Sequence, residues 1–310
     1  MKKQISTGGE TRLRSRLEAC TPVLMLLPAA LGVLCIQVYP SLRSILMSFF
    51  DISLLKKEQP FIGLGNYAKL LGDPVVWRVM INTLLFAALS LVIGGCFAML
   101  IAVELNKNFP GKGLFRTIFL VPWVTPPLVT SMIWKILVSE SFSPINTVLM
   151  KWGVIDHPLN FLGRTETIGG IFSIPMLVMI IINVWSIFPF MMVMFLAGLQ
   201  TIPPELYEAA EMDGARKSQQ FFYVTLPSLI PVISTSILLQ GIWQFNSFNI
   251  SYMVTKGGPL HLTEVMAVRV YSEAFVNFRY GLAAATSVIM LLLVLIPSVF
   301  YLRANLKTAD

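Results

Sequence analysis

Six stretches of this 310-residue chain contain no Asp, Glu, Lys or Arg and consist largely of apolar side chains. A helix needs about 20 apolar residues to cross a bilayer, and most of these stretches are long enough. A large soluble helical protein would instead carry charged faces at helical spacing, which these stretches lack. We therefore predict an all-α integral membrane protein with six transmembrane helices, over Ala19–Leu42, Val79–Val103, Thr117–Trp134, Thr167–Pro203, Ser218–Thr255 and Tyr280–Leu302.

The composition of the whole chain agrees with this prediction. Charged residues make up only 13% of the chain, against about 25% in a typical soluble domain. The third stretch is marginal in length and is interrupted by Pro122, Pro126 and Pro127, while Pro175 and Pro189 fall in the fourth. Irregular backbone at membrane depth is tolerated where it is buried in protein or lines a cavity, although simple packing kinks explain these prolines equally well.

The distribution of basic residues predicts how the spans are oriented. Six spans place both termini on one side, together with the loops near 104–116 and 198–226. These segments are denser in Lys and Arg than the longer opposite loops, which favours cytoplasmic termini. We expect a cytoplasmic segment 1–18, a six-span domain 19–302 and a cytoplasmic tail 303–310. The net charge of +7 follows from this topology and requires no nucleic-acid partner.

Several motifs that would indicate an enzyme or a cofactor site are absent from the sequence. There is no Gly-x-x-x-x-Gly-Lys-Ser/Thr phosphate loop, and no nucleophile–base or metal-ligand constellation. Cys20, Cys35 and Cys96 have no metal-like spacing, and we expect them to be small hydrophobic residues of the core. The spans contain almost no ionisable residues, which argues against a proton- or ion-coupled pump. We predict a chain that is no enzyme and holds no metal or cofactor.

A polar island interrupts the apolar chain between the fourth and fifth stretches. We call residues 203–225 the knob. Pro203 and Pro204 suit the first turn of a helix, and Gly214 can adopt the left-handed conformation that ends one. A second short helix is expected from Ala215, before Leu226-Pro227 opens the next apolar run. The sequence therefore predicts a rigid helix–turn–helix displayed on the cytoplasmic face, although an ordinary amphipathic loop is an alternative.

The knob also carries a resemblance to a known family. Its pattern resembles the EAA loop of permease subunits of binding-protein-dependent ABC importers. Further matches follow in family order along nearly the whole chain, and the set is similar to the carbohydrate-uptake branch, in particular to the first permease subunit of maltose, multiple-sugar and glycerol-phosphate transporters. The matching residues are Glu208-Ala209-Ala210, Asp213-Gly214-Ala215, Phe221 and Leu226-Pro227 in the knob, with Phe61–Tyr67, Asn82-Thr83, Pro189-Phe190, Phe245-Asn246 and Gly257-Gly258-Pro259 elsewhere.

The resemblance implies an architecture, a set of partners and a location. It implies a type I ABC permease in the plasma (inner) membrane of a prokaryote. The expected partners are a second six-span permease subunit, two cytoplasmic ATPase subunits that bind ATP and Mg²⁺, and an extracytoplasmic solute-binding protein. The ATPase-coupling residues carried over are Glu208, Ala209, Ala210, Asp213, Gly214 and Ala215. Ser218 stands where many relatives carry an aromatic residue. This difference concerns the fit to the ATPase and does not alter the family resemblance.

Polar side chains form a stripe on each of two spans. Amides can bind sugar hydroxyls and aromatic rings can stack on sugar C–H faces, so we predict a substrate path here. The alternative is that these amides join helices by interhelical hydrogen bonds. The fourth span contributes Asn183, Ser186 and Phe190, and the fifth contributes Gln240, Trp243, Gln244, Asn246 and Ser247.

Three classes of function remain open at this point. The first is import of a mono- or oligosaccharide by alternating access, with glycerol phosphate and polyols as further solutes. The second is an ATP-independent channel or facilitator for a small polyol, against which the knob argues. The third is a scaffold without a solute path, which would leave both polar stripes unexplained.

Overall fold

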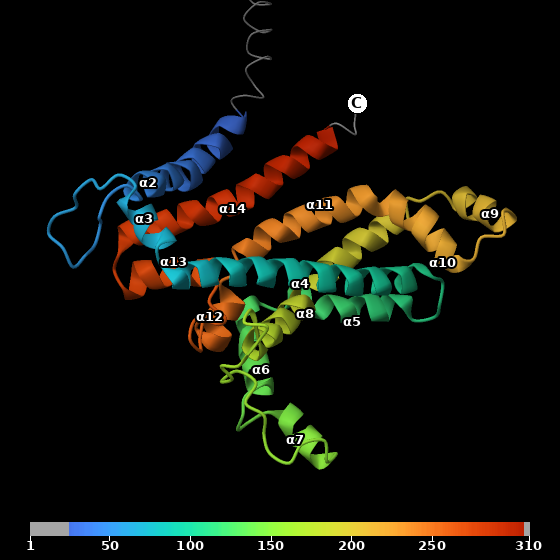
Figure 1. The fold of residues 1–310 in the computed structure, drawn as a ribbon. Coiled ribbons are helices and arrows are strands. Elements are labelled where there is room, and N and C mark those ends of the chain that lie inside the picture. Colours follow the sequence, from blue (N-terminus) through green and yellow to red (C-terminus); the bar gives the residue numbers. More distant parts are fainter. Residues whose placement is uncertain (1–24, 307–310) are drawn as a thin grey trace, which may run out of the picture.

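The computed structural model describes residues 25–306, which are helical over most of their length (Figure 1). The predicted segment 1–18, Cys20 and residues 307–310 of the predicted tail lie outside the described residues. The prediction of an all-α chain is confirmed for residues 25–306. Strand structure there is confined to a two-stranded antiparallel hairpin, β1 (Thr167–Ile168) and β2 (Phe172–Ser173).

Five helices in the described part of the chain are long and apolar enough to cross a membrane, and a bent pair could supply a sixth span. The first runs over Met25–Met47 and includes the π-helix η1 (Leu34–Val38) and α2 (Tyr39–Met47). The others are α4 (Pro74–Asn106), α8 (Ile174–Leu199), the continuous helix Lys217–Phe245, and α14 (Tyr280–Leu306). Lys217–Phe245 comprises α10 (Lys217–Gln220), the π-helix η2 (Phe221–Thr225) and α11 (Leu226–Phe245).

The predicted third span is a sharply bent pair. It consists of α5 (Lys112–Val124) and α6 (Pro127–Leu137), whose axes differ by 94°. Thr125 and Pro126 have extended backbone because a residue that precedes a proline is pushed away from the helical region. Pro122 stays inside α5, and Pro175 lies in the first turn of α8, so neither of these prolines breaks a helix.

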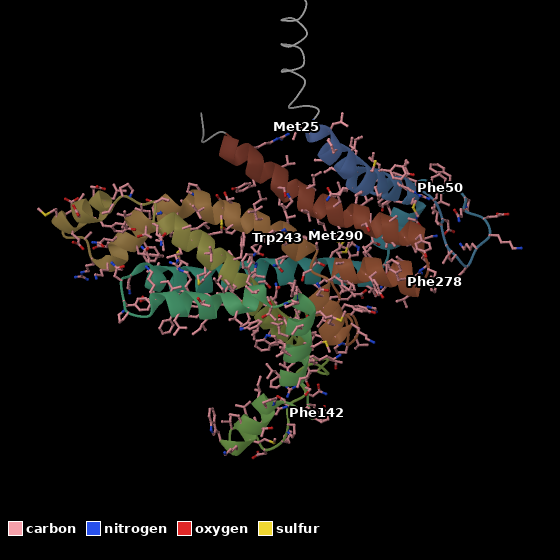
Figure 2. The ribbon with its side chains drawn as sticks, turned by 180° about the vertical axis from the view of Figure 1, so that it is seen from behind. Met25, Phe50, Phe142, Trp243, Phe278 and Met290 are labelled. Atoms are coloured by element: carbon pink, nitrogen blue, oxygen red, sulfur yellow. The ribbon has the colours of Figure 1, made fainter. Side chains whose placement is uncertain are left out.

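Shorter helices connect or flank the long ones. They are α3 (Gly65–Leu71), α7 (Pro144–Lys151), α9 (Pro204–Met212), α12 (Asn249–Thr255), α13 (Met266–Tyr271) and the π-helix η3 (Ser272–Val276). The knob helices α9 and α10 lie at one end, and α13 lies at the other (Figure 1). The segment 139–166 contains α7. Together with α6 it projects away from the long helices, with Phe142 on this arm (Figures 1 and 2).

Side-chain caps fix where the principal helices begin. The Asp73 carboxylate accepts a hydrogen bond from the Val75 N–H at 2.9 Å at the start of α4. The Ser173 hydroxyl accepts from the Met176 N–H at 3.2 Å at the start of α8. These bonds satisfy N–H groups that have no partner within the helix. The apolar stretches alone could not place these ends. In each case a polar cap residue is followed by proline within two positions, Pro74 after Asp73 and Pro175 after Ser173.

The core lies between α4 and α8. A Cβ on Gly94 would approach the Ile187 side chain to 3.3 Å, so a small residue allows the two helices to pack closely. A cluster that includes Ala98, Phe188 and Phe195 fills the half nearer the knob. A second cluster, with Phe86, Met179 and Ile250 among its members, fills the other half. The helix α8 is consequently the most enclosed of the five membrane-length helices.

One prediction about the core is wrong. Cys35 and Cys96 are exposed on the surface of this chain, although we expected small buried side chains. The reason is that in a membrane an apolar side chain gains little from burial in protein, since lipid tails are equally apolar. Many large apolar residues, such as Leu100 and Val124, are exposed for the same reason. Apolar character therefore identified the spans without identifying their inner faces.

Candidate functional site: an amide-lined cavity and an exposed knob

A cavity of about 320 Å³ lies between α8, the bend that joins α5 to α6, and the turn that joins α11 to α12. One wall comes from the bend between α5 and α6, at Pro122, Thr125 and Pro127. The opposite wall comes from the end of α11 and the turn into α12, where Asn246 ends the helix. Figure 2 places Trp243 near the middle of the long helices. Irregular backbone at the α5–α6 bend and in the turn after α11 thus lines the cavity, a setting in which such backbone is tolerated in a membrane protein.

Three predicted amides form a hydrogen-bonded chain in the wall of this cavity. The Asn183 Nδ2 donates to Gln244 Oε1 at 2.7 Å, and the Gln244 Nε2 donates to Gln240 Oε1 at 3.3 Å. All three side chains are at most 5% exposed. The bond between Asn183 and Gln244 joins α8 to α11, so these amides connect two helices and line the cavity at once. For these three residues, a role in the substrate path and a role in joining helices are therefore compatible.

The cavity collects most of the predicted substrate-path residues. Asn183, Ser186, Gln240, Trp243, Gln244, Asn246 and Ser247 all line it. Phe190 is not among the lining residues. Its ring packs against Trp243, with centroids 5.2 Å apart, and against Trp123 at 6.0 Å. The structure therefore places Phe190 behind Trp243, next to the cavity rather than in it.

The sequence analysis missed several residues of the cavity wall. Thr130 of α6 lines the cavity and is 2% exposed, and its hydroxyl has no hydrogen-bond partner within residues 25–306. Phe248 and Asn249, at the start of α12, line it as well. Only the bend at Thr125–Pro127 brings α6 to this cavity. A straight third span, which the length of the apolar stretch suggested, would have given no reason to select Thr130.

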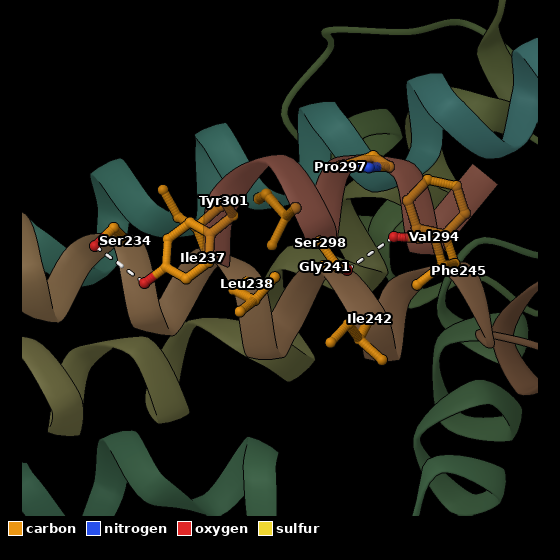
Figure 3. A pocket seen from close by; sticks show the side chains of 11 residues that line it. Ser234, Ile237, Leu238, Gly241, Ile242, Phe245, Val294, Pro297, Ser298 and Tyr301 are labelled. Atoms are coloured by element: carbon orange, nitrogen blue, oxygen red, sulfur yellow. Dashed lines mark hydrogen bonds between the residues drawn. The ribbon is translucent and has the colours of Figure 1, made fainter. Parts of the chain in front are cut away.

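A second hollow, of about 340 Å³, lies between α11 and α14 (Figure 3). Its wall is largely apolar, with Ile237 and Leu238 on one side and Val294 and Pro297 on the other. Its hydroxyl groups are already engaged, since Tyr301 lies 3.3 Å from Ser234 Oγ and Ser298 donates to the Val294 carbonyl. This hollow offers little to recognise a polar solute, in contrast to the amide-lined cavity.

The knob has the predicted helix–turn–helix form. Pro204 is the first residue of α9, and Gly214 has a φ of +76°, in the left-handed region. The turn is closed by two backbone bonds of 2.9 Å, from the Gly214 N–H to the Glu211 carbonyl and from the Ala215 N–H to the Ala210 carbonyl. A Cβ on Gly214 would meet no atom within 4 Å. Backbone conformation, rather than space, therefore favours glycine here.

The second helix of the knob differs from the prediction. It begins at Lys217 and not at Ala215, because Arg216 has extended backbone and its N–H is capped by the Gln219 side chain at 2.8 Å. It is also no separate short helix, since it continues through η2 into α11 as one helix, Lys217–Phe245. Glu208, Ala209, Asp213 and Gly214 are exposed, while Ala210 and Ala215 are half-buried. No group of acidic, His or Cys residues able to hold a metal occurs in the described part of the chain.

These features define a class of protein. Membrane-length helices around a polar cavity, with an exposed helical turn at one end, are features of an integral membrane transport subunit. Residues 94–308 match the family model described as binding-protein-dependent transport system inner membrane component. The chain belongs to this family. It is accordingly an inner-membrane ABC transporter permease and not an enzyme.

Individual relatives extend this match over nearly the whole chain. The trehalose/maltose transport system permease protein MalF of Thermococcus litoralis is 33% identical over 93% of this chain and 94% of its own length. The diacetylchitobiose uptake system permease protein DasB of Streptomyces coelicolor is 33% identical over 98% and 92%. A bacterial ABC transporter involved in import of the polysaccharide alginate has a chain of the same fold, with a TM-score of 0.79 and 22% identity over 96% of this chain and 100% of its own.

Proposed function

We propose that this chain is one of two homologous six-span permease subunits of an ATP-driven importer that carries a mono- or oligosaccharide into the cell. An extracytoplasmic binding protein delivers the solute, and two cytoplasmic ATPase subunits bind ATP and Mg²⁺. Closure of the ATPases acts on the knob and turns the cavity from one side of the membrane to the other. The chain itself binds no nucleotide and no nucleic acid.

One observation carries the proposal. A single helix, Lys217–Phe245, begins in the exposed knob and ends with Gln240 and Gln244 in the wall of the cavity. A rigid helix transmits displacement along its length, so a push on the knob moves cavity side chains directly. A facilitator that needs no ATPase would have no use for such a link.

The chemistry of the cavity supports a carbohydrate. Its polar groups are neutral amides and hydroxyls, and Trp243 and Phe248 supply apolar ring surfaces. Neutral donors and acceptors with aromatic rings suit a solute that has many hydroxyls and apolar C–H faces. Relatives named for trehalose/maltose and for diacetylchitobiose support the same class, and a relative in Agrobacterium fabrum is named for sn-glycerol-3-phosphate. The cavity contains no Lys or Arg to match a phosphate, so we favour an uncharged sugar.

Reconstitution tests the proposal as a whole. The chain is co-expressed with a candidate binding protein, second permease and ATPase from the same genome, and the purified complex is placed in proteoliposomes. We expect uptake of a radiolabelled disaccharide only with both ATP and the binding protein. Equal uptake without ATP would favour the facilitator, and the absence of any uptake with a full set of partners would favour a scaffold.

Substitutions in the amide chain test the substrate path. Gln244→Leu and Asn183→Leu should reduce uptake per assembled complex, or change the preference among related disaccharides, because a sugar hydroxyl loses its partner. Ser234→Ala, in the apolar hollow of Figure 3, is the control and should leave both unchanged. If uptake per complex is unchanged in both leucine variants, the amides only join helices.

Labelling from each side of the membrane tests the orientation. In a cysteine-free background, a cysteine at Lys217 should react with an impermeant maleimide only from the cytoplasm, and one at His261 only from outside. Both side chains are exposed in this chain. The reverse pattern would contradict cytoplasmic termini, which rest on the distribution of Lys and Arg.

A further inference from the structure

The first helix of the knob has few attachments to the rest of the molecule. No residue of α9 is buried. Within residues 25–306, the only side-chain hydrogen bond from α9 to another element joins Tyr207 Oη to Thr225 Oγ1 at 2.9 Å. The Tyr207 ring also packs against the apolar cluster between α4 and α8. The position of α9 against the spans therefore depends heavily on one side chain.

The partner of this bond, Thr225, is unusual among the hydroxyl residues of its helix. Ser228, Thr235 and Ser236 each donate to the carbonyl four residues earlier, at 2.7–2.8 Å. Thr225 is the last residue of the π-helix η2, where the Leu226 N–H bonds the Phe221 carbonyl. This carbonyl is the one that the Thr225 hydroxyl would otherwise use. Within residues 25–306 the Thr225 hydroxyl forms no bond to this carbonyl and pairs with Tyr207 instead.

The bond lies in the wall of a cavity. A cavity of about 350 Å³ beside the knob is lined by Tyr207 and Thr225 together with Lys107, Lys217 and Gln220. Its walls come from the end of α4, from α9, and from the helix that begins at Lys217. Apolar packing across such a space is weak, because atoms that border a void lack partners on one side. The hydrogen bond is the direct link across it.

From these observations we infer that Tyr207 and Thr225 form a positioning strut, which makes α9 and the helix Lys217–Phe245 move as one body. The inference rests on the proposed function of the knob and deepens it. Without the strut, a push on α9 is absorbed by rotation about the turn at Gly214. With the strut in place, the same push displaces the helix that carries the cavity amides.

The experiment measures the geometry and the coupling separately. Spin labels at Met212 and Ile230, both exposed, report the distance between α9 and α11 in the full-length complex in lipid nanodiscs, in a background without native cysteines. Tyr207→Phe and Thr225→Val should each broaden the distance distribution. In proteoliposomes each should raise the ATP hydrolysed per disaccharide by about three- to tenfold, the ratio expected from the loss of one hydrogen bond.

Three further variants make the outcome specific. The double variant should be no worse than either single one, because both remove the same bond. Thr225→Ser keeps the hydroxyl and should restore the narrow distribution. Tyr39→Phe removes the hydroxyl of a tyrosine of α2 that is 61% exposed and lies outside the knob and the cavity, and it should change nothing.

The possible results distinguish failure of the proposed strut from failure of the proposed transport function. An unchanged distance distribution in both Tyr207→Phe and Thr225→Val overturns the strut, whatever the uptake. A broadened distribution with an unchanged ratio of ATP to solute overturns its role in coupling. If the unsubstituted complex shows no ATP-driven uptake while the distributions broaden, the proposed function is wrong and the strut remains.

Discussion

The two ends of the helix bundle are built on different principles. At the end with α13, Arg269 is 14% exposed and lies 3.3 Å from both Asp73 and Glu273, while Arg279 lies 2.7 Å from Glu273. The Asn82 side chain there donates to two loop carbonyls at 2.8 and 3.1 Å. At the knob, no acidic residue of α9 forms an ion pair with another described residue.

The difference indicates which end of the helix bundle is stabilised by contacts within this chain alone. At the α13 end, buried charges are paired across α4, the loop before α13 and η3, so that end is held by the chain itself. At the knob, the acids of α9 are exposed and form no ion pair within residues 25–306, and one side-chain hydrogen bond in this range attaches α9 to another element. Unpaired polar groups on a stiff turn suit a surface that another protein contacts. The comparison predicts that stability is concentrated at one end and coupling at the other.

The largest loss of stability is expected from Arg269→Met. Removing one member of a buried ion-pair network leaves uncompensated charge and costs about 3–5 kcal/mol. We expect the low end of that range, because Glu273 keeps Arg279 as a partner. The measurement is thermal unfolding of the detergent-solubilised complex, with Arg164→Met as the control. The side chain of Arg164 is 40% exposed, and the carboxylate of Glu166 lies 3.9 Å away. Equal unfolding temperatures for the two variants would refute the contrast between the ends.

A smaller loss of stability but a large loss of transport is expected from Gly214→Val. A β-branched residue in the left-handed region costs roughly 1–2 kcal/mol, and the turn would change conformation to avoid it. The second knob helix would then be misdirected, and ATP hydrolysis would no longer drive uptake. Gly113→Val is the control, because a Cβ there meets no atom within 4 Å and its φ is ordinary. Normal uptake by Gly214→Val at normal expression would argue against the coupling role.

The smallest effect on stability is expected from Glu208→Gln. Its side chain is exposed and makes no ion pair with another described residue, so unfolding should change by less than about 0.5 kcal/mol. ATP-driven uptake should nevertheless fall, since the acid is one of the groups offered to the ATPase. Glu140→Gln, in the arm that projects from the bundle, is the matched control for loss of one negative charge. If Glu208→Gln leaves uptake unchanged, this carboxylate is no part of the docking surface.

Local features of the sequence predicted the knob more fully than the cavity. Pro204 and Gly214 each impose a backbone conformation on their own position, so their effect can be read without knowing the fold. The start of the second helix was misplaced by two residues, because the bond between Arg216 and Gln219 gives little signal in the sequence. That this helix continues into α11 was also missed, since Leu226-Pro227 suggested a new beginning.

By itself the sequence determined that the chain is an integral membrane protein, which segments are apolar enough to be candidate spans, and that a helical turn interrupts them, because charge-free length and residues such as Gly214 act locally. Only the tertiary structure decided that the third span bends by 94° at Thr125–Pro127, bringing Thr130 to the cavity while Phe190 stays behind Trp243. The physical reason is that lipid and protein interior are equally apolar. Hydropathy therefore cannot specify which side of a span faces its neighbours, and packing and hydrogen bonds such as that between Asn183 and Gln244 settle it.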